Sequence, residues 1–297
     1  MWIEILFFIV FAMQIFLMSY YYPKRILSRM DYVFKHYPIE THGKLYPDGY
    51  EKALKGKILY GLINNIILVL IIIVFIAFAI AIFSDGIAVF SDSKALESFN
   101  FVPLVVGMVQ GIPLLMFDLS TFKQFKQMRV QNHDPKRRAE LNPRQLLSYV
   151  SPIRLSITIS IFIASAFIIL KLNDFNIGEK EAILLGAMLF TNSIFIGIGY
   201  FLIHGKKMDP HQSAQDRHTT IGVVIRSYTS ISILASVFLV FSRSSNEFSL
   251  EAWEPIFNSL YWQLLMFLST GTMLKYVNLK DINFDVYKAS TPAEPSN

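Results

Sequence analysis

The run ILYGLINNIILVLIIIVFIAFAIAIF, residues 58–83, decides the class of fold. It holds 26 consecutive residues without a charged side chain, and about 20 such residues in a helix cross the hydrocarbon core of a bilayer. Working outward from this run, we find further apolar runs at residues 2–20, 101–117, 153–170, 183–203, 221–241 and 256–274. The sequence therefore predicts an all-α polytopic membrane helix bundle with seven transmembrane helices. These form one domain, residues 1–277, followed by a cytoplasmic tail at 278–297 whose end is disordered.

Lysine and arginine alternate between the segments that connect these runs. Four segments hold 8, 8, 3 and 3 of them, at residues 21–57, 118–154, 204–220 and 275–297. Three segments hold only 1, 2 and 1, at residues 84–100, 171–182 and 242–255. Because basic residues near the ends of spans stay in the cytoplasm, we expect the N-terminus outside and the C-terminus in the cytoplasm. The net charge of +5 follows from this topology and indicates no nucleic-acid partner.

Two segments next to the spans are predicted to be helical as well. Residues 23–36 place apolar residues at helical spacing with basic residues between them, which is typical of a cytoplasmic interfacial helix. The run at 101–117 is the weakest span because it contains Pro103 and Pro113, and we expect its helix to continue into the cytoplasm through Gln131.

The membrane in which the protein resides is indicated by two absences in the sequence. No Lys or Arg precedes the first apolar run, so that run reads as an anchor and not as a cleaved signal peptide. No Asn-x-Ser/Thr acceptor for glycosylation occurs, which favours a bacterial inner membrane. We expect the lipid bilayer as the main partner, with anionic lipid head groups at the basic loops and a protein partner or a second copy of the chain as further possibilities.

Polar residues of the cytoplasmic segments are the candidates for catalysis. All 6 histidines fall in those segments, and a His/Asp/Arg cluster there would suit an enzyme acting on lipid or isoprenoid head groups. Asp, Asn or Ser followed by Pro is also the ordinary start of a helix, which is the structural explanation for several of these residues. Such starts occur at Asp134-Pro135, Asn142-Pro143, Ser151-Pro152 and Asp209-Pro210. We expect the helix that opens at Pro210 to run into the sixth span and to carry His211 and His218 on one face. The candidates are His133, Asp134, His211, Asp216 and Arg217.

Polar residues within the apolar runs are the candidates for a binding or packing role. Arg226 lies about five residues inside its run, where it either reaches back to the head groups or pairs with a carboxylate. Asp118 is the first choice for that carboxylate and Asp216 the second. Uncharged polar groups at similar depth could line a path for a solute or bond to neighbouring helices, and these are Asn64, Gln110 and Asn192.

Two small residues in the third run predict a close helix contact. Gly107 and Gly111 form a GxxxG pattern, which lets two helices approach one another. The row Ser156, Ser160 and Ala164 offers a matching face on the fourth run.

No motif in the sequence specifies a reaction. The chain lacks a phosphate-binding loop, the nucleophile motif GxSxG, the zinc motif HExxH and the dinucleotide motif GxGxxG. It has 0 cysteines, which excludes disulfides and thiolate metal sites, and we predict no cofactor and no metal. Two hypotheses remain. In the first the protein is not an enzyme but either a carrier or channel for a small solute or a membrane-anchored partner of other proteins. The alternative is the head-group enzyme described above.

Overall fold

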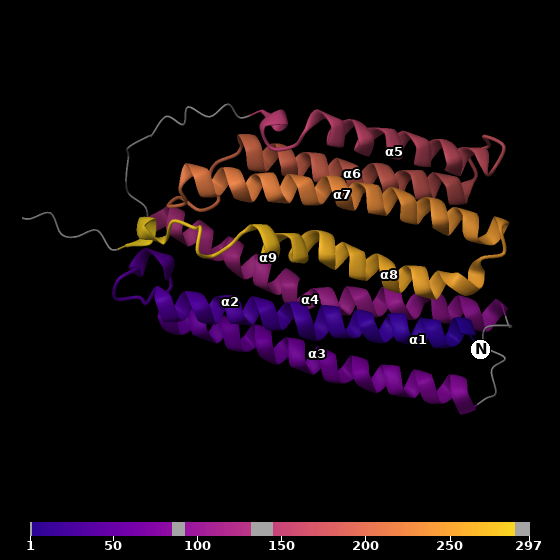
Figure 1. The fold of residues 1–297 in the computed structure, drawn as a ribbon, viewed down its shortest axis with the longest axis horizontal. Coiled ribbons are helices and arrows are strands. Elements are labelled where there is room, and N and C mark those ends of the chain that lie inside the picture. Colours follow the sequence, from indigo (N-terminus) through magenta and orange to yellow (C-terminus); the bar gives the residue numbers. More distant parts are fainter. Residues whose placement is uncertain (1, 85–92, 132–144, 289–297) are drawn as a thin grey trace, which may run out of the picture.

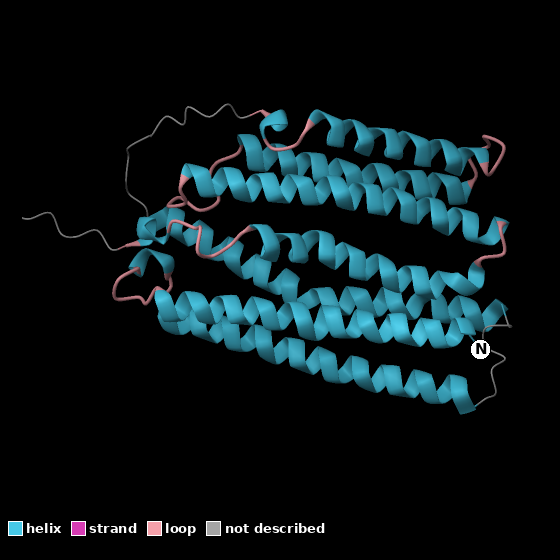
Figure 2. Cartoon of the chain, in the orientation of Figure 1, coloured by secondary structure: helices cyan, strands magenta, loops and turns pink. Residues whose placement is uncertain are grey.

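The computed structural model describes residues 2–84, 93–131 and 145–288. Helices make up 84% of the structure, and the described ranges contain no strand, so the all-α prediction is confirmed (Figure 2). The long helices are α1 (Trp2–Ile15), α2 (Tyr22–His36), α3 (Tyr50–Ser84), α4 (Ser93–Gln131), α5 (Pro152–Lys171), α6 (Glu179–His204), α7 (Ala214–Glu247) and α8 (Glu254–Met266). Shorter elements are π turns at Phe16–Tyr21 and Phe267–Gly271, helix α9 (Thr272–Tyr276), and 3₁₀ turns at Gly43–Leu45, Leu146–Ser148, Glu251–Trp253 and Phe284–Tyr287.

Within these described ranges, six helices are long and apolar enough to cross a membrane. They cover Trp2–His36, Tyr50–Ile80, Phe101–Gln131, Pro152–Lys171, Glu179–His204 and Ala214–Ser245. This result supports an integral membrane protein and confirms six of the expected spans by length and composition.

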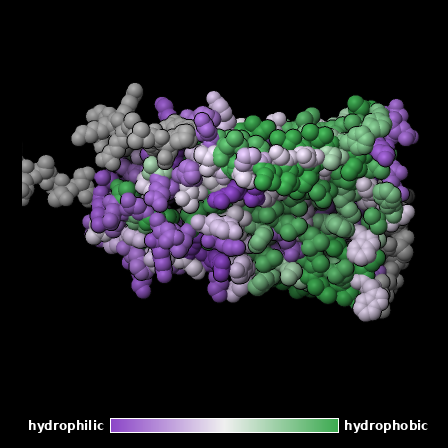
Figure 3. Space-filling view, turned by 45° about the horizontal axis from the view of Figure 1, so that its top comes forward, coloured by the Kyte–Doolittle hydropathy of each residue, from purple (hydrophilic) through white to green (hydrophobic). Residues whose placement is uncertain are grey.

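The helices run side by side along one axis and alternate in direction (Figure 1). The end of α2, the start of α3, the end of α4 and the start of α5 all lie at the end of the bundle opposite the N-terminus. We call this the basic end, because the described parts of the Lys/Arg-rich segments meet there. In Figure 3 hydrophilic residues gather at that end, and a broad hydrophobic belt covers most of the remaining face. Such a belt is what a surface in contact with lipid requires.

The seventh expected span, residues 256–274, is helical but less apolar than the other six. It consists of α8, a π turn and α9, and it packs against α1, α4 and α7 in the interior of the bundle. Neighbouring helices enclose its polar residues: Gln263 is buried and donates from Nε2 to the carbonyl oxygen of Val10 at 3.0 Å. A helix shielded by others needs no continuous apolar surface, which explains its lower hydropathy.

Helix α2 differs from the expected interfacial helix. It continues α1 along the same line through the π turn Phe16–Tyr21, so that one helical rod runs from Trp2 to His36 (Figure 1). Pro23 has no N–H for the carbonyl of Ser19, which a regular helix would pair with it. Asn64 on α3 supplies the missing donor, from Nδ2 to Ser19 O at 2.7 Å. The chain therefore passes the proline without a change of direction.

The described part of the tail packs onto the basic end. The ring of Phe284 stacks on Tyr37, with centroids 3.9 Å apart, and Tyr287 Oη donates to the buried carboxylate of Asp209. Burial raises the pKa of Tyr287 above its usual range, and the negative charge of Asp209 raises it further. The tail thus joins the α2–α3 connection to the α6–α7 connection, whereas the expectation of disorder concerns residues outside the described ranges.

Candidate ligand-binding cavity

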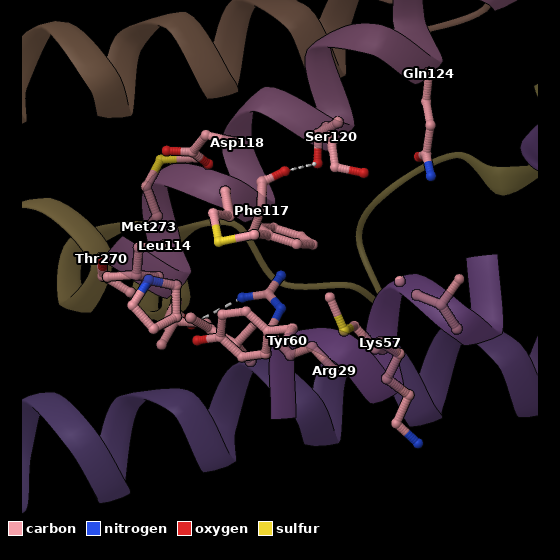
Figure 4. Close-up of a pocket in the computed structure, with 18 of the residues that line it drawn as sticks. Arg29, Lys57, Tyr60, Leu114, Phe117, Asp118, Ser120, Gln124, Thr270 and Met273 are labelled. Atoms are coloured by element: carbon pink, nitrogen blue, oxygen red, sulfur yellow. Dashed lines mark hydrogen bonds between the residues drawn. The ribbon is translucent and has the colours of Figure 1, made fainter. Parts of the chain in front are cut away.

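A cavity of about 800 Å³ lies between the helices near the basic end. Its walls come from α2, α3, α4, α7 and α9, and most of its surface is apolar. Ile26, Met30 and Val33 of α2 face it, so the apolar stripe that the sequence showed on residues 23–36 covers the cavity and not the membrane surface. Figure 4 shows the labelled polar residues that share this space, among them Arg29, Tyr60 and Asp118.

Two cations line the cavity, and both are bound to other groups of the chain. Arg29 donates from Nη1 to the carbonyl oxygen of Leu274 at 3.3 Å and from Nη2 to that of Val277. These carbonyls lie at the C-terminal end of α9, where a cation is favoured by the helix dipole. Lys57 forms an ion pair with Asp31. Both cations therefore already have hydrogen-bond acceptors, although only Lys57 has a carboxylate as its partner.

Asp118 is in the opposite situation. Its side chain is exposed, it lines the cavity from α4, and it has no hydrogen bond or ion pair with any described residue. Tyr60 and Tyr228 face the same space from α3 and α7. Among the charged residues of the described lining, Asp118 is thus the one without a hydrogen bond or an ion pair.

Two buried hydroxyl groups of the cavity wall also have no partner. Tyr60 and Ser227 are each 5% exposed, and neither Tyr60 Oη nor Ser227 Oγ has a hydrogen-bond partner among the described groups. A buried polar atom without a partner costs about 1–3 kcal/mol. The cavity wall therefore holds unused hydrogen-bonding capacity in two hydroxyl groups that are closed off from solvent in this structure.

Two of the intramembrane polar residues chosen from the sequence form a structural network beside α1. Gln110 donates from Nε2 to Ser19 Oγ at 2.9 Å and accepts from Gln14 Nε2 at 3.1 Å, while Asn64 holds the Ser19 carbonyl as described above. Gln14, Asn64 and Gln110 are all buried. Their bonds join α1, α3 and α4, so these residues hold helices together and do not line the cavity.

Asn192 and Arg226 take no part in that network, and they have no hydrogen-bond partner in common. Asn192 donates to Met188 O at 2.8 Å within α6 and accepts from Ser232 on α7. Arg226 is exposed and donates from Nε to the carbonyl oxygen of Gly222, one turn back toward the basic end. It forms no ion pair with Asp118 within the described structure, so its geometry is that of a snorkelling side chain.

The described catalytic candidates each have a local structural partner. Asp216 accepts from Ser213 Oγ at 2.7 Å and from the backbone N–H of Asn283 at 3.2 Å. Arg217 donates to the carbonyl oxygens of Leu202 and Gly205 and so caps the end of α6. The ring of His211 lies 6.1 Å from that of Tyr287, so His211 and Asp216 both face the tail, whereas Arg217 binds the end of α6. His133 and Asp134 lie outside the described residues.

His211 corrects the expected start of α7. The helix begins at Ala214 with Ser213 as its N-cap, and not at Pro210, so His211 precedes the helix and shares no helical face with His218. Its backbone N–H donates to Asp209 Oδ1 at 2.9 Å, and burial lowers the pKa of its imidazole below the usual range. Asp209 is therefore part of the contact with the tail. At Ser151-Pro152, in contrast, the expected helix start is confirmed, because Ser151 is the N-cap of α5.

The residues that sequence reasoning missed are uncharged or were assigned to loops. Tyr60 and Ser227 lie inside apolar runs, and only the position of neighbouring helices makes their hydroxyl groups significant. Glu181 and Arg243 lie in segments that the sequence predicts to be connections, but they form a buried ion pair at 2.8 Å between α6 and α7. No short motif marks either set.

Fold and site together define a helical membrane protein with an interhelical cavity that carries one unpaired carboxylate in the described structure. No group of three His, Cys, Asp or Glu side chains in the described ranges is placed to hold a metal ion. No protein-family model, no curated protein and no solved structure matches this chain.

Proposed function

We propose that the protein is a seven-span, non-enzymatic carrier that binds a small amphipathic molecule in the cavity at its basic end. The observation that carries this proposal is the pairing of buried, partnerless hydroxyl groups with largely apolar walls in a space of about 800 Å³. Ligand sites of small molecules are typically about 300–1,000 Å³, mostly apolar, with a few polar groups that fix orientation. The head-group enzyme has less support, because its described candidate residues serve helix ends and the tail.

Filling the cavity tests this proposal directly. Gly56 lines the cavity with open space beside it, so Gly56→Phe places a ring in the ligand volume. The probe is a diazirine-bearing hexadecanol, photoactivated with the purified protein in phosphatidylcholine nanodiscs and mapped by peptide mass spectrometry. We expect labelling of cavity residues in the wild type and about a fivefold loss in Gly56→Phe, because about one ring volume is excluded from the site.

The matched control is Gly197→Phe. Gly197 on α6 also has open space beside it but lies outside the cavity lining, so labelling of the cavity should stay at the wild-type level. Equal labelling of cavity peptides in the wild type and Gly56→Phe would contradict a binding role for this space.

We also propose that the basic end faces the cytoplasm of a bacterial cell. The support is the distribution of Lys and Arg between alternate connections. Because the chain has 0 cysteines, single replacements report position without background. A membrane-impermeant maleimide applied to intact spheroplasts should label Lys180→Cys and reach Lys55→Cys only after lysis, since both lysines are exposed but lie at opposite ends of the bundle. Labelling of Lys55→Cys in intact spheroplasts would reverse the orientation.

A further inference from the structure

We infer that the cavity selects a molecule with a cationic amine head, held by the Asp118 carboxylate with the hydroxyl groups of Tyr60 and Ser227. The inference rests on the proposed function and adds the chemistry of the ligand's head group. It follows from three features of the described cavity. These are the partners of its charged residues, the two hydroxyl groups that have no hydrogen-bond partner, and its aromatic wall.

The partners of the charged lining residues favour a cationic ligand. Asp118 is unpaired, whereas Arg29 is bound to the carbonyls of Leu274 and Val277, and Lys57 is bound to Asp31. Asp118 is exposed, so its attraction for a positive partner is that of a pair near a protein surface, which is still stronger than in bulk water. An anionic head would have to displace the partners of Arg29 or Lys57 and would also meet the repulsion of Asp118.

The hydroxyl groups supply the geometry that an ammonium group needs. A primary ammonium has three N–H donors and no acceptor. One donor can bind the carboxylate of Asp118. The others would bind Tyr60 Oη and Ser227 Oγ, which have no partners, once a ligand moves these side chains enough to expose their buried oxygens. These groups come from α4, α3 and α7, so a bound head would connect three helices.

The wall beside Asp118 is aromatic. The rings of Tyr60 and Phe117 lie with centroids 5.8 Å apart, and Tyr228 lines the same cavity from α7. Aromatic faces attract cations, most strongly where water is excluded. Beyond them, the apolar side chains of α2 and α9 provide a surface for an alkyl body, so one molecule can satisfy both parts of the cavity.

The test compares three diazirine probes that differ only in the head: hexadecylamine, hexadecanol and hexadecanoate. They are photoactivated in nanodiscs of zwitterionic phosphatidylcholine at pH 7 with the full-length protein. We expect the amine to label cavity peptides about tenfold more than the alcohol, as one charge-assisted hydrogen bond implies, and the carboxylate to label least.

The variant that tests the role of the carboxylate is Asp118→Asn. It keeps the size of the side chain and removes the charge, so the preference for the amine over the alcohol should fall to within about twofold while labelling by the alcohol persists. Asp48→Asn is the matched control, because Asp48 pairs with Lys52 at the same end but does not line the cavity, and the preference should be unchanged.

The outcomes separate the two proposals. Failure of hexadecanol to label the wild-type cavity would overturn the proposed binding function. Labelling by hexadecanol without a preference for the amine, a preference for hexadecanoate, or an amine preference that survives Asp118→Asn would leave binding intact and overturn the inference about the head group.

Discussion

Arg243→Met is expected to lower the melting temperature of the purified protein in detergent by roughly 10 °C. Arg243 and Glu181 form an ion pair at 2.8 Å in which the side chains are 7% and 5% exposed. Arg243 also donates from Nη2 to the carbonyl oxygen of Leu172 at 3.0 Å, so it ties the α5–α6 turn to both α6 and α7. Methionine fills a similar volume but leaves Glu181 as a buried carboxylate without its cation, which is the costly way to break such a pair.

Two further variants show whether the burial of the pair causes the loss. Glu247 accepts from the same guanidinium at 2.8 Å but is 48% exposed, so Glu247→Gln should change the melting temperature by less than about 2 °C. The double variant Arg243→Met with Glu181→Met removes both charges and should recover much of the loss. Similar melting temperatures for Arg243→Met and Glu247→Gln would show that the buried pair adds nothing to stability.

Gly107→Ala is expected to destabilise the packing of α4 against α8 by about 1–3 kcal/mol. A methyl group at this position would overlap the indole ring of Trp262, which lies directly over the Gly107 backbone. The ring cannot retreat easily because Trp262 packs against the buried cluster of Met18, Tyr22 and Met266. The expected readout is an earlier loss of the monodisperse peak when the detergent-solubilised protein is heated before size-exclusion chromatography.

Gly111→Ala provides the matched comparison one helical turn away. No atom lies within 4 Å of a methyl group at Gly111, and alanine is the better helix former by about 1 kcal/mol. This variant should therefore be neutral or slightly stabilising. Equal destabilisation by the two variants would mean that the loss of glycine itself, and not contact with Trp262, sets the effect.

The architecture could largely be predicted from the sequence, because a helix that crosses a lipid bilayer needs about 20 consecutive apolar residues. Six helices meet that rule, and the expected extension of α4 to Gln131 and the N-cap at Ser151 are confirmed. The third run, 101–117, is weak because of its prolines, but the pattern of basic loops requires a crossing there, and Phe101–Gln131 is one of the six helices. The seventh run, 256–274, is helical although polar residues interrupt it. Its enclosure by α1, α4 and α7 explains the weaker signal, whereas the number of spans stays a prediction.

Errors arose where the sequence gives a helical face but not the neighbour of that face. Residues 23–36 have an apolar stripe that suits a membrane surface and an interhelical cavity equally well, and the structure shows the cavity. The small residues of α4 were assigned to a contact with α5, but Trp262 of α8 occupies that place. Likewise, Asp209-Pro210 resembles a helix start, yet Asp209 is buried against Tyr287 of the tail.

The candidate site was harder to predict because its residues are ordinary in isolation. Asp118 was recognised as a carboxylate at the end of a span, but its expected partner Arg226 bonds to its own helix. Asn64 and Gln110 were recognised as unusual at their depth, and they serve helix packing. The site is defined by the space between five helices, and the spacing of residues along the sequence does not predict that space.

The hydrogen bond between Asn64 and the Ser19 carbonyl makes the residue that is tolerated at position 64 depend on the residue at position 23. As long as residue 23 is proline, an apolar residue at position 64 removes a donor from that carbonyl which residue 23 cannot replace. If residue 23 is not proline, its backbone N–H can donate to the Ser19 carbonyl, and the amide at position 64 is no longer needed. Substitutions at positions 23 and 64 should therefore be inherited as a pair, although 41 residues separate them in the sequence.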